Sequence, residues 1–286
     1  MRFCVLTSMA VLLLYHSGSG QPIPSMWKQV VVLLGKETLQ GIVPHGTGFL
    51  MYDYARGDSS MILVTNKHIF GSHEKLYVRF NLSDSVERNQ NVARAMEIPL
   101  RARGPNSKAL WIGHPDSCVD VAVIRIKNPA IVEKLPLALE TVGVSTVKKK
   151  ASLAEGENIV YLGFPFGIGA STRDTPVLRH GIVSLLDGSD CRGEVLLEAQ
   201  ALPGNSGSPV FQVTVLTPDT KLRDMKPPML IGIMSYHQAE YETCLTASGD
   251  TVNVPIHTGL SYMFTVDMVY ETIDALNRAV DHPQGR

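Results

Sequence analysis

The sequence predicts an all-β fold made of two groups of strands and closed by one helix. Short runs of β-branched and aromatic residues recur along the chain, separated by Gly, Asp, Asn and Ser. Regular spacing of such runs is typical of a sandwich or barrel. The long helical periodicity that a βαβ architecture needs is nearly absent. A polar break at residues 134–155 divides the runs into two groups of about six strands each.

The strands are expected in chain order on either side of this break. The first group is KQVVVLLG, GTGFLMYDY, SSMILVTN, KLYVRFNL and DVAVIRI; the second is ENIVYLGF, VLRHGIVSLL, EVLLEAQAL, SPVFQVTVL, MLIGIMSYH and GLSYMFTV. Near the end of the chain, apolar residues recur at steps of three and four, as on one face of a helix: Val266, Val269, Ile273, Leu276 and Val280. We therefore predict a first domain at residues 21–135, a linker at 136–155, and a second domain with the helix at 156–286.

Residues 1–20 have the pattern of a secretory signal peptide. Arg2 supplies a positive charge, residues 3–15 are almost continuously apolar, and small residues follow, ending at Gly20. The apolar stretch is too short to span a bilayer comfortably. We expect cleavage after Gly20 and a secreted or periplasmic protein. A retained N-terminal anchor is the alternative.

Composition restricts the partners and cofactors. The formal net charge is −1 at pH 7, and 44% of the residues are hydrophobic. A near-neutral chain does not suggest nucleic acid, or a membrane after signal removal, as its main partner. Neither CxxC nor HExxH occurs, so no metal site and no cofactor are expected.

A candidate nucleophile lies in GNSGSPV, where Ser206 is flanked by residues that equally suit a tight turn. A serine hydroxyl attacks only when a base takes its proton. His68 follows the apolar run of LVTNKHIF, and a side chain at a strand end is well placed to face a cleft. A catalytic imidazole also needs a carboxylate. Asp120 opens the run DVAVIRI and is the first choice, with Asp116 in HPDSC as the second.

The order His68, Asp120, Ser206 is that of chymotrypsin-type peptidases. GTGFL, LVTNKHIF, DVAVIRI, HGIVS and LPGNSGSPV together resemble the signatures of trypsin-like serine peptidases, in particular the branch of HtrA protease domains and glutamyl endopeptidases. The likeness runs from about Gly46 to the final helix. It implies two antiparallel barrels, chymotrypsin-like, of about six strands each, with the active site between them. HtrA proteins add a PDZ domain after the protease, and we do not expect one here, because only 20 residues follow Val266.

The resemblance also implies a mechanism and some departures from it. Ser206 is expected to attack a peptide carbonyl, form an acyl-enzyme and use His68 as its base, with the N–H groups of Gly204 and Ser206 as the oxyanion hole. Digestive trypsins carry Asp where this chain has Asn205, so activation through a newly cut N-terminus is not expected. Ser208 replaces a commoner glycine.

The substrate pocket follows from the same resemblance. Gln200 occupies the position at the base of the pocket for the side chain before the scissile bond. Ser235, Tyr236 and His237 are expected to form its wall. An uncharged base and a bulky wall favour small or medium uncharged side chains over Arg or Lys. Two alternatives stay open: His237 allows an acidic preference like that of glutamyl endopeptidases, or Gln200 points away from the pocket and decides nothing.

Three cysteines remain after signal removal, so at most one internal disulfide forms. By resemblance, the loops of Cys191 and Cys244 border the pocket. We expect these two to be bridged and Cys118 to be free.

The sequence predicts a secreted serine endopeptidase acting on proteins or peptides, and two other functions are alternatives to it. One is a catalytically silent, protease-like binding module. The other is an α/β-hydrolase that uses Ser206, then Asp224, then His237 or His257. The strand-like run after Pro209 disfavours it, because that fold needs a helix there. The oligomeric state is left open.

Overall fold

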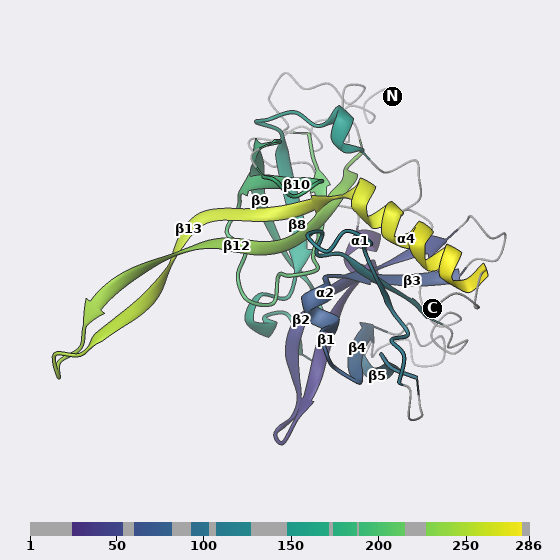
Figure 1. Ribbon diagram of the computed structural model, residues 1–286, viewed down its shortest axis with the longest axis horizontal. Helices are drawn as coiled ribbons and strands as arrows, with labels where there is room; N and C mark the ends of the chain where they lie inside the picture. Colours follow the sequence, from purple (N-terminus) through teal and green to yellow (C-terminus); the bar gives the residue numbers. More distant parts are fainter. Residues whose placement is uncertain are drawn as a thin grey trace, which may run out of the picture.

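The computed structural model describes residues 25–53, 60–81, 93–102, 107–126, 148–171, 174–187, 189–214 and 227–281. The expected signal peptide and most of the expected linker lie outside these ranges. Two β-sheet bodies meet side by side, and a helix lies beside both (Figure 1).

The first body is an antiparallel sheet of seven strands in the order β5-β4-β1-β2-β3-β7-β6. Apolar side chains such as Leu34, Phe49 and Leu63 are fully buried in it. The first of the two predicted barrels is a half-barrel of seven strands, and its sheet is open between β5 and β6 in the described residues. The strands are β1 (Val31–Thr38), β2 (Gly41–Asp53), β3 (Ser60–Thr65), β4 (Lys75–Asn81), β5 (Ala93–Pro99), β6 (Ile112–Gly113) and β7 (Ala122–Ile126).

The second body is a closed six-stranded barrel in the order β10-β13-β12-β11-β8-β9. Closure pairs the edges that an open sheet leaves free. Tyr161, Leu197 and Ile231 belong to its own cluster of buried residues. The predicted all-β, chymotrypsin-like class is confirmed. The strands are β8 (Asn158–Gly163), β9 (Val177–Leu185), β10 (Glu194–Glu198), β11 (Pro209–Gln212), β12 (Met229–Leu245) and β13 (Thr251–Thr265).

The predicted C-terminal helix is α4 (Val266–Asp281). Four of its five predicted core residues are buried, and the side chain of the fifth, Val280, lies outside the described set. α4 contacts β6 and β7 of the first sheet as well as β12 and β13, so it spans both bodies. The short helices are α1 (Ser25–Val30) and α2 (Lys67–Phe70), and the 3₁₀ turns are η5 (Lys150–Ser152) and η6 (Pro165–Gly167). Over the described residues, no helix combines the length and hydrophobicity of a membrane span.

A long hairpin projects from the barrel (Figure 1). It consists of the outer parts of β12 and β13, residues 238–258, and is called the arm below. Within the arm the two strands pair with each other, from Ala239 opposite His257 to Leu245 opposite Thr251. Many of its apolar side chains are exposed. The sequence had suggested a strand ending near His237, so the arm is a new finding.

Candidate active site

His68 and Asp120 are brought together in the first body. His68 lies on α2, directly after β3, and Asp120 lies just before β7. The Asn66 side-chain amide donates to the Asp120 carbonyl oxygen at 2.7 Å and fixes this segment. His68 Nδ1 lies 2.6 Å from Asp120 Oδ2, and the His68 backbone N–H donates to Oδ1 at 3.1 Å. Because an ionised carboxylate can only accept, Nδ1 carries the proton and Nε2 is left as an acceptor.

Asp116, the second-choice carboxylate, has different partners. Its Oδ1 accepts a hydrogen bond from the Cys118 backbone N–H at 3.0 Å, and its carbonyl oxygen accepts one from Lys67 Nζ at 2.8 Å. Burial lowers the pKa of Lys67 from its usual value, although Asp120 and Asp116 oppose this. The geometry therefore selects Asp120 as the partner of His68.

Ser206 is connected to this pair through Ser235. The Ser206 hydroxyl donates to the Ser235 carbonyl oxygen at 2.9 Å, and the Ser235 hydroxyl donates to Asp120 Oδ2 at 3.1 Å. In the described part of the chain, no hydrogen bond joins Ser206 directly to His68. The four residues thus form one cluster at the junction of the two bodies, with the Ser206 hydroxyl turned toward Ser235.

Thr47 of β2 holds the loop of Ser206 from the opposite body. Its N–H donates to the Ser206 carbonyl oxygen at 2.9 Å, and its hydroxyl donates to the Gly204 carbonyl oxygen at 2.7 Å. The same hydroxyl accepts a hydrogen bond from the Phe164 N–H at 3.1 Å, and Thr65 donates to the Thr47 carbonyl oxygen at 2.8 Å. Since Thr47 is fully buried, the loop is fixed by a polar contact between the bodies.

Two glycines allow the loop its close approach. Gly204 has φ +98° and Gly207 has φ +88°, in the region that favours glycine. A Cβ on Gly207 would lie 1.8 Å from the Thr47 carbonyl oxygen. The N–H groups of Gly204 and Ser206 donate to no acceptor within the described residues. Two free donors beside a serine hydroxyl have the form of an oxyanion hole.

Gln200, the expected base of the pocket, has an exposed side chain. Arg179 donates to its Oε1 at 3.2 Å, and the Tyr161 hydroxyl donates to its carbonyl oxygen at 2.9 Å. Gln200 and Arg179 line an open hollow of about 650 Å³ whose lining does not include Ser206 or Ser235. The role of Gln200 in specificity stays a prediction.

The expected wall residues have distinct surroundings. Ser235 is buried, while the half-exposed ring of Tyr236 packs on Tyr262 with centroids 4.8 Å apart. The Tyr236 hydroxyl donates to Glu194 Oε1 at 2.6 Å, and burial, followed by this hydrogen bond, raises the Tyr236 pKa. The side chain of His237 lies outside the described residues.

Residues 46–215 match the family model of the trypsin-like peptidase domain, which is more than half of the chain. The chain belongs to the trypsin-like peptidase family. None of the curated proteins compared with it matches in sequence.

Solved structures agree with the fold of this trypsin-like peptidase. The HtrA-type protease AlgW with a tripeptide is 17% identical, with a TM-score of 0.51 over 91% of this chain and 63% of that one. The chain thus spans less than two thirds of that protease. Human heparin binding protein is 12% identical, with a TM-score of 0.50 over 91% of this chain and 96% of that one. At such identities the likeness shows the fold alone, and it confirms the fold that the resemblance implied.

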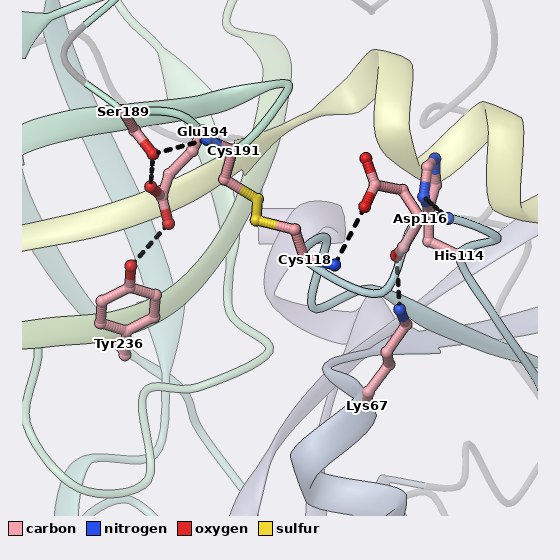
Figure 2. Close-up of a disulfide and its surroundings, with 8 residues drawn as sticks. All are labelled: Lys67, His114, Asp116, Cys118, Ser189, Cys191, Glu194 and Tyr236. Carbon is pink, nitrogen blue, oxygen red and sulfur yellow. Dashed lines mark hydrogen bonds between the residues drawn. A yellow bond between two sulfur atoms is a disulfide. The ribbon is translucent and has the colours of Figure 1, made fainter.

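The disulfide prediction for this trypsin-like peptidase is wrong. Cys191 is bonded to Cys118, with Cα atoms 5.8 Å apart, and Cys244 is free and exposed. Figure 2 shows Cys118 and Cys191 facing each other, with Asp116 beside the first, and Ser189 and Glu194 beside the second. The reason is the arm, because β12 carries Cys244 out toward the tip of the hairpin.

Sequence reasoning missed what Thr47 does in this trypsin-like peptidase, and it gave Ser235 only a place in the pocket wall. The motif GTGFL is part of the family resemblance, but the sequence assigns no role to the hydroxyl of its threonine, Thr47. A buried hydroxyl that joins two bodies has no local sequence signal, because its partners lie far along the chain. The sequence offered one hint of this role, because Thr47 lies between two glycines, Gly46 and Gly48.

In the described residues, no group of His, Cys, Asp and Glu is arranged to hold a metal ion.

Proposed function

We propose that this protein is a secreted serine endopeptidase that cleaves protein or peptide substrates through an acyl-enzyme. One observation carries the proposal: His68, Asp120, Ser235 and Ser206 form a continuous hydrogen-bonded cluster beside two free N–H groups. A silent binding module has no need of this arrangement.

The proposed mechanism uses each member of the cluster. The Ser206 hydroxyl turns from the Ser235 carbonyl oxygen and attacks the peptide carbonyl, while His68 Nε2 takes its proton. Asp120 keeps the imidazole in the required tautomer and stabilises its charged form. The N–H groups of Gly204 and Ser206 donate hydrogen bonds to the carbonyl oxygen as it becomes negatively charged. Each such donor stabilises the transition state by about 2.7–4 kcal/mol. His68 then protonates the leaving amine, and water hydrolyses the acyl-enzyme in a second cycle.

Export is part of the proposal. The signal-like pattern of residues 1–20 motivates it, and the Cys118–Cys191 disulfide supports it, because such bonds persist in oxidising compartments. Protein beginning at Gln21 is proposed to be active without a further cut, since Asn205 cannot form the ion pair that activates digestive trypsins.

An uncharged side chain before the scissile bond is the proposed preference. Gln200 supplies no negative charge, and Arg179 places a positive charge beside it. Gln200 therefore offers a substrate Arg or Lys no ion pair. Profiling with a mixed peptide library tests the preference, and dominant cleavage after Arg or Lys contradicts it.

The decisive experiment replaces the nucleophile. Ser206→Ala is expected to lower hydrolysis of a denatured protein substrate by more than about 10³-fold and to abolish labelling by a fluorophosphonate probe. Its unfolding midpoint should match that of the wild type. Ser208→Ala, in the same loop, is the matched control and should keep labelling. Normal hydrolysis by Ser206→Ala contradicts the mechanism, and a wild-type protein that neither hydrolyses nor labels favours the silent module.

A further inference from the structure

Asp120 lies in the loop that connects β6 to β7, residues 114–121, called the carboxylate loop below. The loop begins at His114, whose N–H donates to the Val121 carbonyl oxygen at 2.8 Å and closes its base. The Asp116 N–H donates to His114 Nδ1 at 3.1 Å, so the imidazole also fixes the turn that follows it. The position of the candidate catalytic carboxylate therefore depends on what holds this loop.

The segment that carries the imidazole base holds the carboxylate loop at two points. Lys67 Nζ donates to the Asp116 carbonyl oxygen at 2.8 Å, and the Asn66 side-chain amide donates to the Asp120 carbonyl oxygen at 2.7 Å. Figure 2 shows Asp116 in contact with both Lys67 and His114. His114 is thus a third point of support, and its own partner determines how firmly it is held.

The imidazole of His114 connects the carboxylate loop to α4. It is almost completely buried, and a buried polar side chain is stable only when its polar atoms are hydrogen-bonded. Nε2 lies 3.3 Å from Oε2 of Glu271, which belongs to α4, while Nδ1 accepts the Asp116 N–H. Because a backbone N–H only donates and an ionised carboxylate only accepts, both bonds form only when the proton is on Nε2. His114 can therefore join the loop to α4 in one tautomer.

Glu271 is in turn fixed by a segment of the second body. Arg192 donates to both of its carboxylate oxygens, from Nη1 to Oε1 at 2.9 Å and from Nη2 to Oε2. Such bidentate pairs fix geometry as well as charge. The hydrogen bonds from Arg192 lower the pKa of Glu271 from its usual value, so the carboxylate is ionised and can accept from His114. Cys191, directly before Arg192, is bonded to Cys118 of the carboxylate loop, so the same segment reaches the loop by a second route.

We propose that His114 and Glu271 are positioning residues of this peptidase, which hold Asp120 where it orders the imidazole of His68. This inference rests on the proposed endopeptidase function and extends the active site to the C-terminal helix. A contact that only stabilises the fold affects the free energy of unfolding. A positioning contact also affects kcat and the hydrogen bond between His68 and Asp120, because a small misplacement of a catalytic group slows the chemical step.

The first test removes the acceptor on α4. Glu271→Ala should lower kcat for a peptide substrate by about tenfold and keep KM within about twofold, because the groups that bind the substrate are unchanged. Glu271→Gln keeps an oxygen that accepts from His114, so its kcat should stay within about twofold of the wild-type value. Asp274→Ala, at an exposed position on the same helix, is the matched control and should keep the wild-type kcat.

His114→Asn supplies a second variant. Its shorter side chain can still accept from the Asp116 N–H, but it does not reach Glu271. It should therefore lower kcat by about the same factor as Glu271→Ala, again without a change in KM. Urea denaturation identifies any variant that is not folded, and the test then rests on the other variant.

A second readout does not depend on cleavage. A proton in a short hydrogen bond between an imidazole nitrogen and a carboxylate gives a proton NMR resonance far downfield of the amide region. His68 Nδ1 lies 2.6 Å from Asp120 Oδ2, so its proton should give such a resonance, and the loss of the signal in His68→Ala assigns it. The resonance should broaden or disappear in Glu271→Ala and persist in Glu271→Gln and Asp274→Ala.

The outcomes separate the two proposals. A wild-type kcat and an unchanged resonance in Glu271→Ala overturn the positioning role, even though the protein cleaves peptides. Equal losses of kcat in Glu271→Ala and Glu271→Gln assign the effect to the charge that pairs with Arg192 and overturn the role of His114. A resonance that Glu271→Ala weakens, in a wild type that cleaves no peptide, supports the positioning role and contradicts the endopeptidase function. A wild type without the resonance has no bond for α4 to position, and this result also overturns the inference.

Discussion

The inner and outer parts of β12 behave as different kinds of structure, although one continuous strand contains both. The inner part is paired on both edges up to Ile233, and Leu230, Ile231 and Ile233 are fully buried. At its end, both polar groups of Ser235 are engaged with the candidate catalytic residues. In the described residues, the outer part is paired on one edge only, and it exposes Tyr241 and Leu245. One strand can therefore be a buried part of the barrel along one length and an exposed hairpin strand along the next, and the change occurs at Ser235, beside the candidate active site.

Replacing cysteines should give the largest difference in stability between the junction of the two bodies and the arm. Cys118→Ala/Cys191→Ala should lower the free energy of unfolding by about 2–5 kcal/mol, because the disulfide closes a loop across a sequence separation of 73 residues. Cys244→Ala, on the exposed arm, should change it by less than about 0.5 kcal/mol. Urea denaturation of the oxidised proteins measures both. A large effect of Cys244→Ala would show that the arm is also part of the scaffold.

Acid should weaken the first body through His45, which lies within β2 and packs on His73. Burial, then Lys36 and His73, lower the pKa of His45 to about 4. The unfolded imidazole takes up its proton near pH 6.5, so between these values the unfolded state binds more protons. The free energy of unfolding should therefore fall as the pH drops from about 6.5 to about 4, and because His45 is only partly buried, solvent screening reduces the size of this loss. Urea denaturation of the wild type and of His45→Gln at several pH values tests this prediction. If the free energy of unfolding falls with pH as steeply in the variant as in the wild type, the prediction is wrong.

Thr47 gives the smallest expected change in stability. Thr47→Val keeps the shape and removes the hydroxyl contacts with Gly204 and Phe164, which should cost about 1–2 kcal/mol. Peptide hydrolysis should fall by about tenfold through kcat, because the loop of Ser206 is less firmly held. The matched control is Thr243→Val on the arm, where the hydroxyl bonds Asn253 in an exposed position. Its effect on stability should stay below about 0.5 kcal/mol. Equal losses in both variants would contradict the distinction.

The sequence predicted those features of the molecule that depend on residues close together in the chain. The helical spacing around Val269 and Ile273 gave α4, and the polar ends of two apolar runs gave His68 and Asp120, which the structure joins. The disulfide was missed because pairing depends on where β12 carries Cys244, and exposed and buried strands have similar residue patterns. The opening of the first sheet depends on two distant edges that do not meet.

The contact between Thr47 and Gly204 joins residues 157 positions apart, which has a consequence for the order of folding. Contacts of such long range form late, after the loop between them has closed and both bodies have taken shape. The loop of Ser206 is held in place only when the two bodies dock, so neither half gains the site by folding alone. Under the proposed endopeptidase function, a partly folded chain would be unable to cut its neighbours, and proteolysis would begin only with the finished molecule.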